Sequence, residues 1–180
     1  MDLALSRKTM RTERLTVRPV EAEDWKSIRE IWRDFEKTEY RIYDTPKSTA
    51  ADDVKRRIAR WAAASQSGNE HVFFAVCLED KPIGFISLNA RAGGYELGYG
   101  FLNECHGKGY AKESLTAVLE LARELGAKKV FAGTAMKNLP SAALLKSLGF
   151  RLAGTETVSF FKDAEGNDIC FEGGKFEKEL

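Results

Sequence analysis

The spacing of apolar side chains predicts one short strand and then two helices in the first third of the chain. Residues 14–18, RLTVR, alternate polar and apolar side chains as a strand does. From Trp25 onward, apolar residues recur at intervals of three and four, which predicts a helix with Asp24 as its N-cap. After a loop rich in tyrosine at 40–49, a second helix is expected, with an inward face of Val54, Ile58 and Trp61.

The middle of the chain has the pattern of three strands joined by tight turns. The segments HVFFAVCL, IGFISL and YELGYGFL are apolar or alternating, and EDKP and NARAGG separate them. Short runs of this kind with turn residues between them are typical of an antiparallel meander. The third strand, 95–102, leads into a loop that contains two glycines.

The last third is expected to hold two helices and three strands. An apolar stripe at helical spacing predicts a helix at 110–125 that ends at Gly126. The strand KKVFAGT follows, and then a short helix in NLPSAALLKSLG with Pro140 in its first turn. FRLAGTETVSFF and DICFEGGKFE read as the final two strands. The fold class is therefore α+β (mixed α/β), with about seven strands and about four helices in a single domain, 1–180.

Composition and charge exclude several classes of protein. The 180 residues include 28 basic and 27 acidic side chains, so the net charge of +1 gives no support for nucleic-acid binding. No apolar run reaches the roughly 20 residues that cross a bilayer, and the opening segment, MDLALSRKTMRTER, has no secretory h-region. Three scattered cysteines and two histidines suggest neither a disulfide framework nor a metal centre. We expect a cytoplasmic protein with no membrane partner, either a monomer or a homodimer.

The turn Gly107-Lys108-Gly109 separates the third meander strand from the helix at 110–125. No Asp or Ser stands there to cap the helix, and glycine allows the backbone to present bare N–H groups. A helix N-terminus with free N–H groups favours a phosphate ligand. The segment is neither GxxxxGK[ST] nor GxGxxG, so a P-loop or dinucleotide fingerprint is not indicated. A tight turn without a ligand remains the alternative.

Three segments resemble motifs of the GNAT superfamily of N-acetyltransferases. His106-Gly107-Lys108-Gly109-Tyr110-Ala111 is similar to the family's acyl-CoA loop, although His106 stands where Gln or Arg is usual. YELGYGFLN resembles the family strand that carries the pantetheine arm, and NLPSAALLKSLGF resembles its N-x-x-S…L-x-x-L-G-F segment. The resemblance covers roughly 12–175 with the order of elements intact. GKGYA followed by Glu113, together with N-x-x-S, is most similar to the ribosomal-protein N-terminal acetyltransferase branch, the RimJ/RimL type.

The resemblance implies a layered, mostly antiparallel sheet that splays between its fourth and fifth strands to receive acetyl-CoA. The backbone of 106–111 would hold the pyrophosphate, and backbone groups near Phe101 and Leu102 would pair with the pantetheine amides. Asn138 would contact the pantetheine arm. Ser141 would lie near the sulfur and could protonate the leaving thiolate, because Leu145 occupies the position where other branches place a tyrosine acid.

Acetylation of an amine requires a base, an oxyanion donor and a leaving thiolate. Glu96 is the candidate base, acting through a water, because strand alternation groups it with Gly98 and Gly100 near the proposed cofactor loop. A backbone N–H near Phe101 is the candidate oxyanion donor. The alternatives are that Glu96 is a solvent-facing strand residue and that Ser141 caps its helix together with Asn138.

The acceptor amine is expected to bind between the first two helices, the loop between them and the last hairpin. Tyr40, Tyr43 and Asp44 are the candidate contacts, and Asp44 could attract a cationic amine. Ordinary loop residues over an aromatic core are the alternative. The predicted function is acetyl-CoA-dependent N-acetylation of a protein N-terminus or a small amine. The alternative function is an acyl-CoA sensor of the same fold without turnover.

Overall fold

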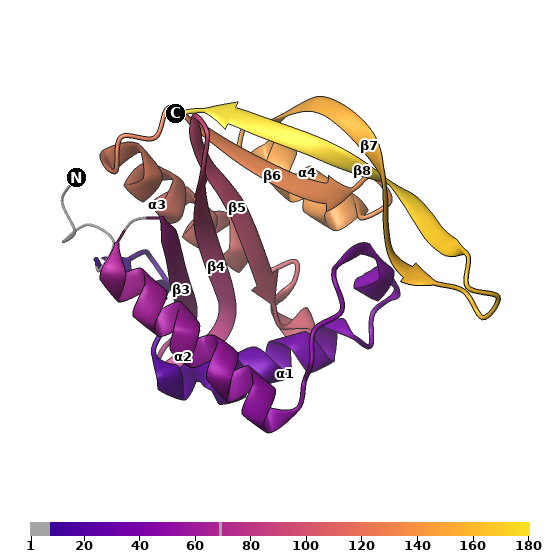
Figure 1. Ribbon diagram of the computed structural model, residues 1–180. Coiled ribbons are helices and arrows are strands. Elements are labelled where there is room, and N and C mark those ends of the chain that lie inside the picture. Colours follow the sequence, from indigo (N-terminus) through magenta and orange to yellow (C-terminus); the bar gives the residue numbers. More distant parts are fainter. Residues whose placement is uncertain (1–7, 69) are drawn as a thin grey trace.

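The computed structural model describes residues 8–68 and 70–180. Residues 1–7, which belong to the opening segment that we expect not to be a secretory signal, lie outside the described residues. The described strands form one eight-stranded sheet in the order β1-β2-β3-β4-β5-β6-β8-β7, and the helices cover both of its faces (Figure 1). The mixed α+β class is confirmed, with one short strand, β1 (Met10–Arg11), beyond the seven expected.

The first half of the chain builds one side of the molecule. β2 (Leu15–Pro19) and the 3-10 turn η2 (Ala22–Asp24) lead to α1 (Trp25–Phe35), and η3 (Glu39–Tyr43) precedes α2 (Ala51–Ser67). Most of the predicted inward residues are buried: Ile28, Ile31, Trp32, Val54 and Ile58. Trp61, also expected to face inward, is only partly buried and packs against the edge of this cluster. These helices cover the central sheet through a cluster that includes the α1 and α2 side chains together with Ala75 and Cys77.

Asp24 does not cap α1, contrary to the expectation from sequence. Its carboxylate accepts two hydrogen bonds from the Arg18 guanidinium, at 2.8 and 2.7 Å, and one from the backbone N–H of Glu21 at 2.8 Å. A paired guanidinium is a stronger partner for a nearly buried carboxylate than a helix amide. Asp24 therefore ties β2 to the start of α1.

The predicted meander is confirmed as β3 (His71–Leu78), β4 (Lys81–Arg91) and β5 (Gly94–Phe101), all antiparallel. The turn η4 (Asn103–Cys105) follows, and then α3 (Tyr110–Glu124). The helix stripe of α3 packs on the other face of the sheet, in a cluster that includes Leu97 and Phe101 of β5. The two faces of β5 therefore meet different helices.

The C-terminal part adds β6 (Lys129–Ala135), α4 (Leu139–Ser147), β7 (Arg151–Lys162) and β8 (Asp168–Glu179). β6 pairs with β5 in parallel, and β8 lies between β6 and β7. The pairing of β5 with β6 ends at Leu97 and Ala132, so the two strands diverge beyond that point (Figure 1). This divergence is the splay expected between the fourth and fifth strands of the predicted sheet.

None of the helices among the described residues is both long and apolar enough to cross a membrane.

Candidate active site

The loop before α3 adopts the conformation that its glycines predict. Gly107 and Gly109 have φ values of +73° and +82°, in the left-handed region that favours glycine. Gly109 is the N-cap of α3, and no side chain among the described residues caps it. The first intrahelical bond is donated by the Glu113 N–H to the Gly109 carbonyl, at 3.0 Å. His106–Gly109 are exposed, so the loop lies at the surface, and it leaves the first amides of α3 without a side-chain partner.

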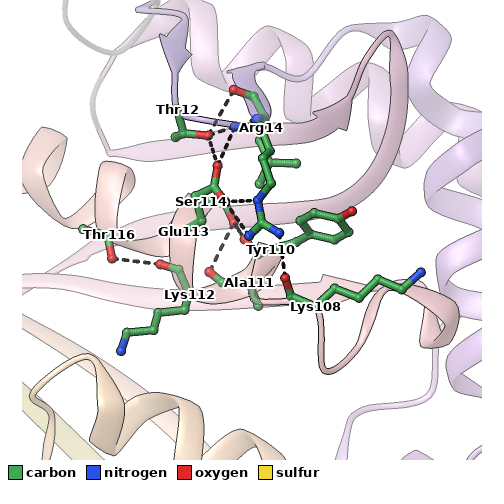
Figure 2. A network of polar contacts seen from close by, with 10 residues as sticks. Thr12, Arg14, Lys108, Tyr110, Ala111, Lys112, Glu113, Ser114 and Thr116 are labelled. Carbon is green, nitrogen blue, oxygen red and sulfur yellow. Dashed lines mark hydrogen bonds and ion pairs between the residues drawn. The ribbon is translucent and has the colours of Figure 1, made fainter.

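A network of polar contacts fixes this loop to the turn before β2 (Figure 2). The Arg14 Nη1 donates to the carbonyl of Lys108 at 2.9 Å, and the guanidinium lies 4.6 Å from the centre of the Tyr110 ring. The Glu113 carboxylate accepts from Thr12 Oγ1 at 2.5 Å, from the Arg14 backbone N–H at 2.8 Å and from Arg14 Nε at 2.8 Å. One arginine therefore connects the glycine turn to the first turn of the helix.

Glu113 is held in its charged form by these contacts. Burial alone would raise the pKa of this carboxyl, but the hydrogen bonds from Thr12 and Arg14 and the charge of Arg14 outweigh burial and lower the pKa. The side chain is 16% exposed, so the ion pair is only partly screened by water.

The beginning of the loop is anchored by α1. The backbone N–H of Asn103 donates to Asp34 Oδ2 at 2.7 Å, and Asn103 Nδ2 donates to the Asp34 carbonyl at 3.1 Å. The Leu102 N–H donates to the Ile83 carbonyl on β4 at 3.0 Å, so this N–H is not available to a ligand. Since successive residues of a strand direct their backbone groups to opposite sides, Phe101 presents its N–H toward the open edge of β5.

The alternation of side chains gives β5 two chemically different faces. Leu97, Tyr99 and Phe101 lie on the face toward α3 and α4, whereas Glu96, Gly98 and Gly100 lie on the face toward α1 and α2. A Cβ at Gly98 would lie 2.7 Å from Ser87 Oγ, and a Cβ at Gly100 would lie 2.7 Å from the Phe85 ring. The Phe85 ring therefore disfavours a side chain at Gly100, whereas at Gly98 the Ser87 hydroxyl would have to rotate away.

Ser141 lies at the start of α4 and meets the sheet through a tyrosine. Its Oγ is 2.8 Å from the hydroxyl of Tyr99, and its backbone N–H donates to Asn138 Oδ1 at 3.3 Å. Burial raises the pKa of Tyr99, and the hydrogen bond with Ser141 offsets part of that effect. The Asn138 side chain thus caps α4, as the alternative interpretation expects, but the Ser141 side chain takes no part in the cap. The Ser141 hydroxyl instead faces Tyr99 in the splayed part of β5.

Glu96 stands one residue before the last β5–β6 pair. Its side chain is 53% exposed, and Oε2 lies 3.4 Å from Arg91 Nη1. The carboxylate is therefore open to water and weakly paired. These features are compatible with both sequence interpretations, a base that acts through a water and a solvent-facing residue.

The structure brings the predicted acceptor loop against the last hairpin. The ring centres of Tyr43 and Phe171 are 5.1 Å apart with an interplanar angle of 64°, and the ring centre of Tyr40 lies 6.4 Å from that of Tyr43. Asp44 forms an ion pair with Lys47 and accepts the Thr45 N–H at 2.7 Å. Because its charge is already compensated, Asp44 is a weaker attractor for a cationic amine than the sequence suggested.

Tyr99, Arg14 and Asp34 are candidate site residues that sequence reasoning did not single out. The alternation of β5 was a usable signal for Tyr99, because it places this residue with Leu97 on the helix-covered face. The partners of Arg14 and Asp34 lie 99 and 69 positions away in the chain, and no local pattern indicates such contacts. Among the described residues, no group of three or more His, Cys, Asp or Glu is placed to hold a metal ion.

Comparison with known proteins assigns this chain to a family. Residues 14–151 match the family model described as acetyltransferase (GNAT) domain. The uncharacterized N-acetyltransferase p20 of Bacillus licheniformis is 30% identical over 152 residues, which cover 82% of this chain and 84% of the relative.

Solved structures share the fold over nearly the whole chain. Ribosomal-protein-S5-alanine acetyltransferase from Vibrio fischeri has a TM-score of 0.80 and 18% identity, covering 96% of each chain. RimL, the ribosomal L7/L12 α-N-protein acetyltransferase, in complex with coenzyme A, has a TM-score of 0.80 and 14% identity, covering 96% of this chain and 98% of that chain. The chain therefore belongs to the GNAT acetyltransferase family and is an acyltransferase whose fold matches the RimJ/RimL-like branch.

Proposed function

We propose that this protein transfers the acetyl group of acetyl-CoA directly to a primary amine, in a ternary complex of both substrates. The acceptor is the α-amine of a protein N-terminus or the amine of a small molecule. The solved relatives favour an N-terminal α-amine, because their names refer to alanine of ribosomal protein S5 and to the α-amine of L7/L12. The buried or scattered cysteines are consistent with a reducing cytoplasm.

The observation that carries this proposal is the divergence of β5 from β6 after Leu97. Beyond that point the free edge of β5 offers main-chain groups near Phe101, where a pantetheine arm would bind as an added strand. The amides after Gly109, which have no side-chain cap among the described residues, would lie at the end of the same edge and hold the pyrophosphate. Asn138 and Ser141 of α4 would border the arm.

The two faces of β5 separate the two halves of the reaction. On the α1/α2 face, Glu96 would accept a proton from the amine through a water, and the acceptor would enter beside Tyr43. On the opposite face, Tyr99 and Ser141 would border the sulfur. An amine can therefore attack the thioester from one side while the thiolate leaves on the other, without a covalent enzyme intermediate.

A panel of N-terminal peptides and small amines tests the function. Wild-type protein is incubated with acetyl-CoA, and acetylated products are read by mass shift while released thiol is measured in parallel. We expect acetylation of peptides that begin with Ala or Ser, with stoichiometric thiol release. Alanine is in the name of the S5 enzyme, and N-terminal serine of L7/L12 is in that of the Salmonella typhimurium acetyl transferase, 15% identical with a TM-score of 0.79. Thermal stabilisation by CoA without thiol release under any amine would instead indicate a sensor.

Replacing Glu96 should change the pH dependence of the rate. In Glu96→Gln, we expect kcat/KM to fall by about tenfold near pH 7 and little above pH 9, because an α-amine with a pKa of about 7.7–8.0 then needs no base. Steady-state rates from pH 6 to about 9.5 on one N-terminal peptide measure the effect. Glu120→Gln, on the exposed face of α3, is the control. A variant profile parallel to that of the wild type would remove Glu96 from the mechanism.

Shortening Tyr43 should weaken binding of the acceptor peptide without affecting binding of acetyl-CoA. Tyr43→Ala removes the ring that contacts Phe171, and we expect the KM for the peptide to rise by about five- to tenfold, since an aromatic contact is worth about 1 kcal/mol. The KM for acetyl-CoA should stay unchanged. Equal KM values for the peptide in both proteins would exclude this loop from the acceptor site.

A further inference from the structure

A hydrogen bond joins β5 to α4 where β5 no longer pairs with β6. The Tyr99 hydroxyl lies 2.8 Å from Ser141 Oγ, across 42 positions of sequence. Tyr99 follows the last pair of the two strands, Leu97 with Ala132, and Ser141 lies in the first turn of α4. Both hydroxyl groups thus border the opening that the proposed function assigns to the thioester.

The acidity of the two hydroxyl groups indicates which one donates. A phenol has an ordinary pKa of about 10 and is a stronger acid than an aliphatic alcohol, so Tyr99 is the better donor of the pair. Burial raises the pKa of Tyr99 further, so this donor stays protonated at neutral pH. When Tyr99 donates to Ser141 Oγ, the hydrogen of Ser141 is free to turn toward a third atom.

We propose that Tyr99 is a positioning residue: it donates to Ser141 and thereby directs the Ser141 hydroxyl hydrogen at the sulfur of the leaving thiolate. This inference rests on the proposed function. The proposal also names a group that can stabilise the leaving thiolate. Leu145, at the position where other branches of the family place a tyrosine acid, is fully buried and has no proton to donate. The strand supplies the aromatic hydroxyl that this helix lacks.

The step balances without a further reactant. The amine nitrogen forms a bond to the acetyl carbon, the carbon–sulfur bond breaks, and its electron pair stays on sulfur. The amine proton passes to water on the Glu96 side. The thiolate is held by the hydrogen bond from Ser141, and it takes up a proton from solvent when CoA leaves, since a thiol has a pKa of only about 8.5.

Steady-state kinetics test whether Tyr99 acts through Ser141. The variants are Tyr99→Phe, Ser141→Ala and the double variant. With acetyl-CoA and an N-terminal Ser or Ala peptide, each single variant should lose about tenfold in kcat, with the KM for acetyl-CoA within about twofold of wild type. The double variant should be no slower than Ser141→Ala, because Tyr99 acts through Ser141. Tyr95→Phe is the matched control, on the same face of the same strand but inside the part that pairs with β6.

A wild-type kcat in Tyr99→Phe would overturn the proposal. So would a double variant whose loss equals the product of the two single losses, because the residues would then act independently.

A second measurement needs no acceptor. At a pH of about 8.5, where half of free CoA is thiolate, ultraviolet absorbance gives the thiolate fraction of bound CoA. We expect a larger fraction on the wild type and on Tyr95→Phe than on Tyr99→Phe or Ser141→Ala. Equal fractions in the wild type and Tyr99→Phe would overturn the proposal. If the wild type acetylates no amine, the proposed function fails and this measurement still decides on the pair. Absence of CoA binding to the wild type would overturn both.

Discussion

Gly109→Val is expected to abolish coenzyme A binding while the fold persists. Gly109 has a φ of +82°, which a β-branched residue adopts only with strain, and a Cβ there would lie 3.2 Å from Arg14 Nη2. The loop would turn away and its amides would no longer converge on the pyrophosphate. We expect the Kd for CoA, measured by calorimetry, to rise by at least about 100-fold, which corresponds to roughly 3 kcal/mol.

Gly166→Val is the matched control for backbone strain. Gly166 has a φ of +88° in the turn between β7 and β8, and no atom lies within 4 Å of a Cβ built there. Both variants should lose about 1–2 kcal/mol of folding free energy from the left-handed conformation, but only Gly109→Val should lose CoA. If Gly109→Val binds CoA as tightly as Gly166→Val does, the loop amides do not hold the diphosphate.

Removing the Glu113 carboxylate is expected to lower both the stability of the fold and the affinity for coenzyme A. In Glu113→Ala, Thr12 Oγ1, the Arg14 N–H and the Arg14 guanidinium lose their common acceptor. Thr12 is half-buried but Arg14 is exposed, so water replaces part of the lost interaction, and we expect a loss of about 1 kcal/mol that chemical denaturation should detect. Because Arg14 also holds the Lys108 carbonyl, we expect the Kd for CoA to rise by about tenfold, or roughly 1.4 kcal/mol.

The same carboxylate should make stability depend on pH. Its pKa is lowered in the folded state, so its contribution is fully present above its unfolded pKa of about 4.3 and is lost as the pH falls through the folded value. Glu113→Gln should therefore lower the unfolding free energy at pH 7 but approach the wild-type value at strongly acidic pH. Glu120→Gln should leave both stability and CoA affinity unchanged. If the difference in unfolding free energy between Glu113→Gln and the wild type were the same at pH 7 and at strongly acidic pH, the ion pair between Glu113 and Arg14 would be contradicted.

The sequence predicted the helices, the meander and the glycine turn because all of them depend on short-range rules. The apolar spacing of α1, α2 and α3 repeats with the helix period, so the buried sides of these helices could be read directly. The tight turn at Gly107 and Gly109 requires residues that accept a positive φ, and the glycines are visible in the sequence. In the same way, the alternation of β5 put Glu96 on the opposite face from Leu97.

Asp24 shows where local reasoning fails. Asp before a helix is a common N-cap, but here the guanidinium of Arg18, on the preceding strand, binds the carboxylate instead. The order β6-β8-β7 is equally invisible to local pattern, because sequence spacing does not tell which strand enters the middle. The short strand β1 has only two residues, too few for a period.

By itself, then, the amino-acid sequence determined the helices, the meander, the glycine turn and the resemblance to an acyl-CoA loop, since these are set by residues a few positions apart. Only the tertiary structure decided that Arg14 braces the loop through Lys108, that Glu113 anchors that arginine, and that Tyr99 meets Ser141. Those contacts join positions from 42 to 99 residues apart, and they form because packing of the helices on a splayed sheet brings their elements together.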